Sequence, residues 1–310
     1  SEFEDVLKDA QEKGYAEKDP SADIEGYDAC RKIAILTSLV CGQQVDFNDI
    51  HTEGITKISA TDIKYAKQMG RVIKLLASSK KTENGYSAMV APFLLSPEHP
   101  LYNVNDVFNA IFVHGNVLGD AMFYGSGAGK LPTASAVVGD MISAVRFGDE
   151  PEKIGWSSEK LEVHPAAELS RKYFARFEGS ERAKKEAVAA AFGDVKFVTL
   201  EGTDEFAVLT GEMTGEEFDA AAAKVGGLRQ KPDYDPDMVP DAMPVSDDDR
   251  ALLSGMRGNE SRPGTPFRAS GTKLSVPSGG TVYGIGSCVG CGFLDPVFCH
   301  GKQEIPTGVG

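Results

Sequence analysis

The sequence predicts an α+β fold: a mixed β-sheet with helices on one face, then a small ferredoxin-like βαββα module, then an irregular tail. Three observations lead to this prediction. Residues 1–147 mix helix-period segments with apolar, strand-like runs, and residues 166–228 show the order strand, helix, strand, strand, helix. Residues 148–165 between them are polar and punctuated by Gly and Pro, as in a linker, and residues 229–310 include long stretches rich in Asp, Pro, Gly and Ser.

The elements of the first unit follow from apolar spacing and capping residues. Helices are predicted at about 3–13, 27–40, 61–70 and 132–146. Thr61 is the expected N-cap of the third helix, and Gly70 is its expected end. Strands are predicted at about 71–79, 86–95 and 107–113, and a further apolar run at 121–125 leads into a glycine-rich turn.

The second unit and the tail have different compositions. Strands are predicted at about 172–178, 195–200 and 205–211, and helices at about 181–192 and 215–225. This order and this size suit a small ferredoxin-like module. The tail, residues 229–310, has few large apolar side chains over long stretches, so no secondary structure is predicted there.

Charge and composition argue against two classes of partner. The formal net charge is −14 at pH 7, so the chain lacks the basic surface on which nonspecific nucleic-acid binding depends. No uninterrupted apolar stretch reaches the ~18 residues that a membrane span needs, and the charged first residues are unlike a signal peptide. Five cysteines, an odd count, without an export signal favour a reducing, cytoplasmic environment.

The densest polar cluster of the first unit is GYAEKDPSADIEGYDACRK, residues 14–32. Asp28 and Lys32 are four residues apart on a predicted helix, so their side chains share one face. The helix continues into the apolar IAILTSLV, which would hold the lysine away from water and shift its pKa toward working pH, as a general acid or base requires. The alternatives are a surface ion pair of about 0.2–0.5 kcal/mol and, for Glu17 and Asp23, plain solvation.

A second cluster is GSGAGKLPTASAVVGD, residues 125–140. Its turn consists of small residues: Gly125, Gly127, Ala128 and Gly129. Small residues let a backbone approach a ligand closely, and the N-terminus of the following helix favours anionic or carbonyl groups. The turn is not a P-loop, because Leu131 follows Lys130 where Ser or Thr is required. It could equally be a tight connection.

These segments, GYAEKDPSADIEGYDACRK and FYGSGAGKLPTASAVVGD, resemble the catalytic domain of homoserine dehydrogenases. The stretch EGITKISATDIKYAKQMGRVIKLLA, residues 53–77, is also similar to the corresponding stretch of that family, and the resemblance covers about residues 3–147 in register. It implies NAD(P)-dependent interconversion of L-aspartate 4-semialdehyde and L-homoserine, on the aspartate route to threonine, methionine and isoleucine.

The resemblance also implies roles for the motif residues. Lys32 would donate the proton to the carbonyl oxygen, and Asp28 would orient it. Glu17 and Asp23 would hold the amino group of the small-molecule substrate. The turn formed by Gly125, Gly127, Ala128 and Gly129 would lie against the nicotinamide and the substrate. Family members are typically homodimers or larger homo-oligomers, so the same is expected here.

The sequence departs from the family pattern at its start. The family carries an N-terminal Rossmann domain that binds most of the dinucleotide, and no such domain is recognisable in residues 1–310. This chain alone is therefore expected to be inactive, and the choice between NADP and NAD stays open. The runner-up interpretation is a regulatory or oligomerisation protein that keeps the dehydrogenase body without its cofactor domain.

Two later regions also leave alternatives. Residues 166–228 stand where many family members carry an ACT domain, but the turn EGSERAKK lacks the expected proline, so amino-acid regulation and a dimerisation role both remain open. The stretch TVYGIGSCVGCGF, residues 281–293, contains G-x-G-x-x-x-G without a following helix pattern, so no dinucleotide site is expected there. The spacing of Cys288, Cys291, Cys299 and His300 favours free thiols over a zinc site, so no metal is expected.

Overall fold

The computed structural model describes residues 19–82, 85–106, 108–116, 119–127, 129–148, 155–230 and 281–283. Its first elements are α2 (Ser21–Ile24) and α3 (Tyr27–Cys41). Gly26 between them has a φ of 79°, a left-handed conformation that glycine adopts without strain. The helix predicted at 27–40 is confirmed by α3, whereas the one predicted at 3–13 lies outside the described residues.

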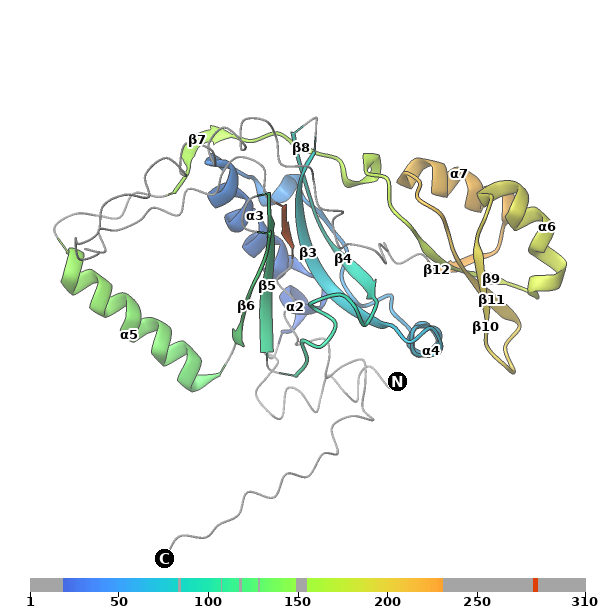
Figure 1. Cartoon of the computed structure of the whole chain (residues 1–310), viewed down its shortest axis with the longest axis horizontal. Helices are drawn as coiled ribbons and strands as arrows, with labels where there is room; N and C mark the ends of the chain where they lie inside the picture. The colour runs from blue at the N-terminus through green and yellow to red at the C-terminus, as the bar shows by residue number, and fades with distance from the viewer. Residues whose placement is uncertain are drawn as a thin grey trace, which may run out of the picture.

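The body of the chain is a mixed seven-stranded sheet (Figure 1). Its strand order is β2-β4-β3-β13-β5-β6, and β8 pairs with β4. The strands are β2 (His51–Thr52), β3 (Val72–Thr82), β4 (Gly85–Leu95), β5 (Phe108–Gly115), β6 (Gly119–Ser126), β8 (Val163–His164) and β13 (Thr281–Tyr283). β2 and β8 run parallel to β4 and the other pairs are antiparallel, so the predicted mixed sheet is confirmed.

Helices cover one face of this sheet. Alternation along β3 places Ile73, Leu75 and Ala77 in one core with α3 and α4 (Ala60–Gln68), and Leu76 in the core of the opposite face. The buried stripe of α3 has helical spacing: Ala29, Cys30, Ile33, Ala34, Thr37 and Ser38. The opposite face is covered in part by the segment after β4, which contains Leu101.

The start of α4 corrects one sequence prediction. The N-cap is Ser59 rather than Thr61, because the Ser59 hydroxyl accepts from the Asp62 N–H and the Asp62 carboxylate accepts from the Ser59 N–H at 2.8 Å. This reciprocal pair is a capping box, and it satisfies two backbone donors that a helix start otherwise leaves free. The sequence S-x-x-D carries the signature, but Thr61 is an equally good cap by composition.

Two stretches predicted to be irregular contain strands. The polar segment 148–165 includes β7 (Ser157–Lys160), which pairs with β1 (Gln43–Gln44), and β8 on the sheet edge. The tail, expected to be irregular, contributes β13 between β3 and β5. Unpaired backbone groups of a neighbouring strand can recruit such segments whatever their polarity, which local composition does not reveal. The rest of 231–310 lies outside the described residues.

The second unit is a four-stranded antiparallel sheet with two helices. Its elements are β9 (Phe174–Glu178), α6 (Glu181–Phe192), β10 (Lys196–Thr199), β11 (Glu205–Leu209), α7 (Gly215–Val225) and β12 (Leu228–Gln230). The predicted order strand, helix, strand, strand, helix is observed, and β12 completes the sheet. The strand order β10-β11-β9-β12 is that of a ferredoxin-like βαββαβ module.

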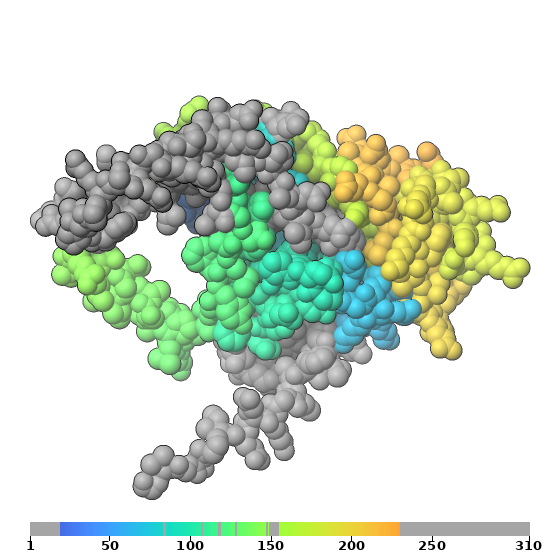
Figure 2. All heavy atoms as spheres, viewed as in Figure 1, coloured from blue at the N-terminus to red at the C-terminus, as the bar shows by residue number. Residues whose placement is uncertain are grey.

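The two faces of this smaller sheet have different neighbours. One face packs under α6 and α7 through aromatic side chains: Tyr173, Phe177, Phe206, Phe192 and Phe218. The other face contributes Phe174, Val198 and Ala207 to the core of the body, where they join Tyr65 of α4. The module therefore lies beside α4, as Figure 1 shows. In Figure 2, open space separates much of α5 (Lys130–Phe147) from the large sheet.

Candidate functional site

The candidate site begins in the turn before α3. The Pro20 carbonyl accepts hydrogen bonds from the N–H groups of Asp23 and Ile24, both at 3.0 Å, so α2 is one tight turn. The hydroxyl and the N–H of Ser21 donate to Asp19, and these hydrogen bonds lower the pKa of its carboxyl group. Asp23 is partly buried in this turn. Glu17 lies outside the described residues.

Two glycines let this turn lie directly on the body. A Cβ at Gly26 would come within 3.0 Å of Val90 Cγ1, and a Cβ at Gly54 would come within 2.1 Å of the Ile24 carbonyl oxygen. The Ile55 N–H donates to that same oxygen at 2.8 Å. The backbone of residues 53–55 therefore supports the turn from below. Sequence reasoning missed both glycines, whose one signal is the repeated Glu-Gly pair.

The structure brings Asp28 and Lys32 into direct contact. Lys32 Nζ lies 2.7 Å from Asp28 Oδ2, one turn earlier on α3, as the spacing predicted. The expected withdrawal of Lys32 from water is wrong, because its side chain is 43% exposed. Lys32 precedes the buried Ile33 and lies at the edge of the buried stripe rather than within it. Its ammonium group can therefore meet a molecule that approaches from outside this chain.

Residues on the other side of α3 are structural. The Cys30 thiol donates to the Phe47 carbonyl oxygen at 3.3 Å, and burial raises the pKa of this thiol. A buried thiol with a raised pKa is a poor nucleophile, so Cys30 is a packing residue. The Arg31 guanidinium lies 5.7 Å from the centre of the Phe47 ring and covers it.

The glycine-rich turn connects β6 to α5. A Cβ at Gly127 would overlap the Asn109 side chain at 1.2 Å, so any other residue there would displace that side chain. Gly129 starts α5 with a φ of 114° and no side-chain cap, which leaves the first N–H groups of an 18-residue helix open to a ligand. A Cβ at Gly125 would meet nothing within 4 Å. Ala128 lies outside the described residues.

The predicted site residues thus lie on three elements and one turn. Asp23 is in α2, Asp28 and Lys32 are in α3, Gly125 is near the end of β6, and Gly127 and Gly129 are in the turn between β6 and α5. Within the described ranges, no group of three or more His, Cys, Asp or Glu residues could hold a metal ion. The cysteines at 288, 291 and 299 and His300 lie outside those ranges. No helix that the structure describes is long and apolar enough to cross a membrane.

The Asp28–Lys32 ion pair faces solvent beside an acidic turn, on a helix that packs against a mixed β-sheet. This arrangement is suited to an enzyme domain that binds a small polar substrate. Comparison with known proteins makes the class specific. Residues 1–142 match the homoserine dehydrogenase family. Residues 1–142 therefore carry the sequence pattern of the homoserine dehydrogenase family.

Individual relatives agree with this assignment. The chain is 35% identical over 246 residues to a homoserine dehydrogenase of Neisseria gonorrhoeae, covering 74% of this chain and 57% of the relative. It is 49% identical over 151 residues to that of Corynebacterium glutamicum, covering 47% and 34%. The crystal structure of a homoserine dehydrogenase from Thiobacillus denitrificans matches with a TM-score of 0.65 and 29% identity, over 76% of this chain and 58% of that one. The chain thus spans between about one third and three fifths of the length of these relatives.

Proposed function

We propose that this chain supplies the substrate-binding and proton-transfer half of an enzyme that interconverts L-aspartate 4-semialdehyde and L-homoserine with NAD(P). The observation that carries the proposal is the 2.7 Å contact between Asp28 and the exposed Lys32, within the segment that matches the family. A carbonyl that is being reduced needs a proton donor at hydrogen-bond distance, and a lysine ammonium on an open surface can reach it.

Each residue would have a distinct task. Lys32 Nζ would donate a proton to the substrate carbonyl oxygen during reduction and accept it back during oxidation. Asp28 would hold the lysine in its rotamer through the ion pair. Asp23 and Glu17 would bind the substrate ammonium group, because carboxylates are its natural partners. The turn at residues 19–26 would then set the distance between the amino end and the carbonyl end of the substrate.

The turn between β6 and α5 fits a nicotinamide cofactor. Gly125 leaves open space where a side chain would project, and the uncapped start of α5 offers N–H groups. When bound, NAD or NADP supplies the hydride. We propose that Gly125, Gly127, Ala128 and Gly129 bring the backbone close to the nicotinamide and the substrate, and that most of the dinucleotide is held by a domain other than those described. These 310 residues alone are expected to turn over homoserine negligibly.

The proton-transfer role is tested by Lys32→Met in the full-length enzyme. We expect kcat to fall by ~10²–10⁴-fold, because a general acid typically contributes that much. The matched control is Lys64→Met, which removes an exposed lysine of α4 and should leave kcat unchanged. A Lys32→Met enzyme with normal kcat would refute the proposed role.

The cofactor turn is tested by Gly125→Ala. Since the new methyl group meets nothing within 4 Å in this chain, stability should not change. The KM for the dinucleotide should rise, because the methyl group would occupy the space proposed for the nicotinamide. An unchanged KM for both cofactor and substrate would contradict the proposed position of the nicotinamide next to Gly125.

The partners are also proposals. We propose a homodimer or larger homo-oligomer, supported by apolar side chains that β6 and α5 leave exposed: Met122, Phe123, Tyr124, Leu131, Met141 and Val145. β4 and β5 each pair with strands on both sides, so neither offers a free edge for pairing with a second copy of the chain. Sedimentation velocity on the full-length enzyme measures the assembly. A monomer at micromolar concentration would contradict it.

The ferredoxin-like module has two alternative roles, which calorimetry distinguishes. An ACT-like module that binds an amino acid would give saturable heat in calorimetry with threonine. A structural module would give none. The face of its sheet that α6 and α7 do not cover packs against α4, and this contact supports the structural alternative.

A further inference from the structure

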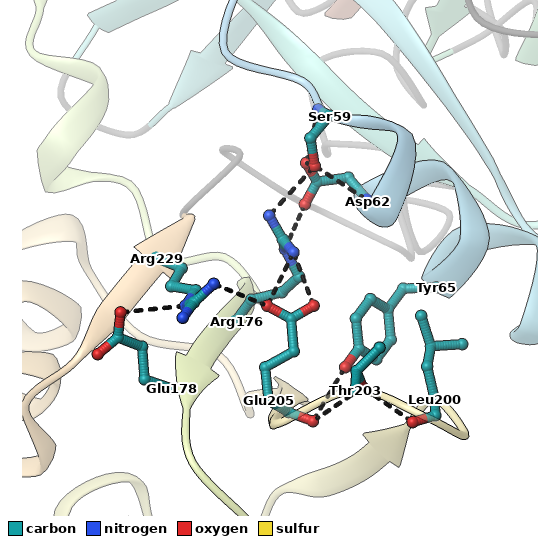
Figure 3. Close-up of polar contacts among 9 residues, drawn as sticks. All are labelled: Ser59, Asp62, Tyr65, Arg176, Glu178, Leu200, Thr203, Glu205 and Arg229. Carbon is teal, nitrogen blue, oxygen red and sulfur yellow. Dashed lines mark hydrogen bonds and ion pairs between the residues drawn. The ribbon is translucent and has the colours of Figure 1, made fainter.

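One buried arginine joins the module to the body (Figure 3). Arg176 of β9 places Nε 2.7 Å from Asp62 Oδ1 of α4, and Nη1 donates to the Glu205 carboxylate of β11 at 2.8 and 3.1 Å. Its Nη2 donates to Ser59 Oγ at 3.2 Å. The side chains of Arg176, Asp62 and Glu205 are 9%, 0% and 7% exposed. A single guanidinium therefore binds two carboxylates away from water.

The network has an apolar, buried side and a charged, exposed side. Tyr65, one turn after Asp62, is fully buried and donates its hydroxyl to the Glu205 carbonyl oxygen at 3.3 Å. Burial raises the pKa of Tyr65, so this donor keeps its proton. The ring centre of Tyr65 lies 6.0 Å from that of Phe174 on β9. Arg229 reaches Glu205 from the exposed side at 3.9 Å and pairs with Glu178 at 3.1 Å.

The network lies at one end of a short segment that backbone hydrogen bonds and buried side chains fix in place. Ser59 and Asp62 form the cap of α4, and residues 53–58 lead from that cap back to the candidate site. The Ile58 N–H donates to the Ile55 carbonyl at 3.0 Å, and the Ile55 N–H donates to the Ile24 carbonyl at 2.8 Å. Both isoleucines are buried in the same core as α3. Gly54 packs so closely against the backbone of Ile24 and Glu25 that a Cβ at this position would overlap it.

We propose that Arg176 is a positioning residue for the substrate site. Through Ser59 and Asp62 it fixes the start of α4, and through residues 53–58 it fixes the turn that carries Asp23. The fork of a guanidinium suits this task, because it holds several oxygens at set angles, whereas an ammonium group holds them without angular preference. The module is then a structural part of the substrate site. This inference rests on the proposed function for the role of Asp23, but the coupling itself does not.

The test compares two destabilised variants of the full-length enzyme at matched stability, with a third, conservative variant beside them. Arg176→Met removes the guanidinium from the interface. Phe218→Leu weakens the module from its other face, where Phe218 packs against Tyr173 with ring centres 4.6 Å apart. Conditions are chosen so that both variants show the same fall in melting temperature. Arg176→Lys, which keeps the charge without the fork, is the conservative variant.

Two readouts follow the positioning role. Hydrogen exchange at the amides of residues 23–26 and 55 should become about tenfold faster in Arg176→Met, and the KM for homoserine should rise about three- to tenfold with a smaller change in kcat. Arg176→Lys should show intermediate values. Phe218→Leu should leave both readouts at the wild-type level.

The proposal is overturned if faster exchange in Arg176→Met stays within residues 59–70 and 174–210, or if Phe218→Leu changes the site equally. The exchange readout does not depend on catalysis. An enzyme without homoserine activity would therefore remove the proposed function while the exchange data still decide the coupling.

Discussion

Two ion pairs of this protein have the same length and opposite surroundings. Lys32 and Asp28 approach to 2.7 Å with side chains that are 43% and 37% exposed. Arg176 and Asp62 also approach to 2.7 Å, but their side chains are 9% and 0% exposed. Distance alone does not distinguish them. The exposed pair can reach a ligand and contributes little to folding, whereas the buried pair cannot reach solvent and depends on complete pairing.

The comparison separates reactivity from architecture. A group that transfers a proton must meet its substrate, so Lys32 lies at the edge of the buried stripe of α3. A group that holds two units together gains from exclusion of water, because the electrostatic attraction is less screened there.

Arg176→Met should lower the free energy of unfolding by about 3–5 kcal/mol, because it leaves the Asp62 carboxylate buried without its cation and leaves Glu205 with only the more distant Arg229. Urea unfolding measures the change. Arg229→Met is the matched control: its side chain is 49% exposed, so the loss should stay below about 1 kcal/mol. Replacing Asp62, Arg176 and Glu205 together by apolar residues should recover most of the stability. An Arg176→Met variant as stable as the Arg229→Met variant would break the contrast.

His99 shows how a buried ionisable group behaves when none of the described residues gives it a charged partner. It is 3% exposed, and burial lowers its pKa to about 4 from the usual histidine value of 6.5. Below pH 6.5 His99 binds a proton in the unfolded chain, whereas in the folded chain it does so only near pH 4. Stability should therefore fall by about 3 kcal/mol over this range, about 2 kcal/mol of it by pH 5.

The variant His99→Asn measures this contribution. Its side-chain oxygen can still accept the Leu101 N–H, which donates to His99 Nδ1 at 3.1 Å, but it does not titrate. Unfolding at pH 7.5 and pH 5 should show a smaller loss in the variant than in the wild type. Substitution of the exposed His51 by Asn should leave the wild-type loss unchanged. Equal losses in all three proteins would contradict the assignment to His99.

Gly54→Ala tests whether the exposed site rests on a rigid backbone. The new methyl group would lie 2.1 Å from the Ile24 carbonyl oxygen, so the two segments must move apart at a cost of about 1–3 kcal/mol. Gly211→Ala is the control, because a Cβ there meets nothing within 4 Å. A Gly54→Ala variant with the stability of Gly211→Ala would show that the turn has freedom to move.

Asp28→Asn should have the smallest effect on folding. An exposed pair at this spacing on a helix contributes about 0.2–0.5 kcal/mol, and salt screens it. Urea unfolding at low and high salt should therefore barely distinguish the variant from the wild type. A loss above about 2 kcal/mol would show that this pair, like the buried one, has a structural role.

Much of the fold was accessible from local patterns. The periodicity of residues 27–40 and 181–192 predicted α3 and α6, and the apolar runs predicted β3, β4 and β5. These patterns are reliable because helices and strands repeat their buried positions over short distances. The strands β7, β8 and β13 escaped prediction because short polar or small-residue segments pair only when a partner strand is near.

The sequence alone indicated the resemblance to the family, the helix that carries Asp28 and Lys32, and the contact between them, since all of these depend on local sequence. Only the tertiary structure decided how exposed that contact is, because burial depends on what packs around α3. It alone also showed the network at the module interface, which joins Ser59 to Arg176 across 117 positions of the chain. No local pattern pairs an arginine in an apolar strand with two distant acids; the packing of one sheet face against α4 brings them together.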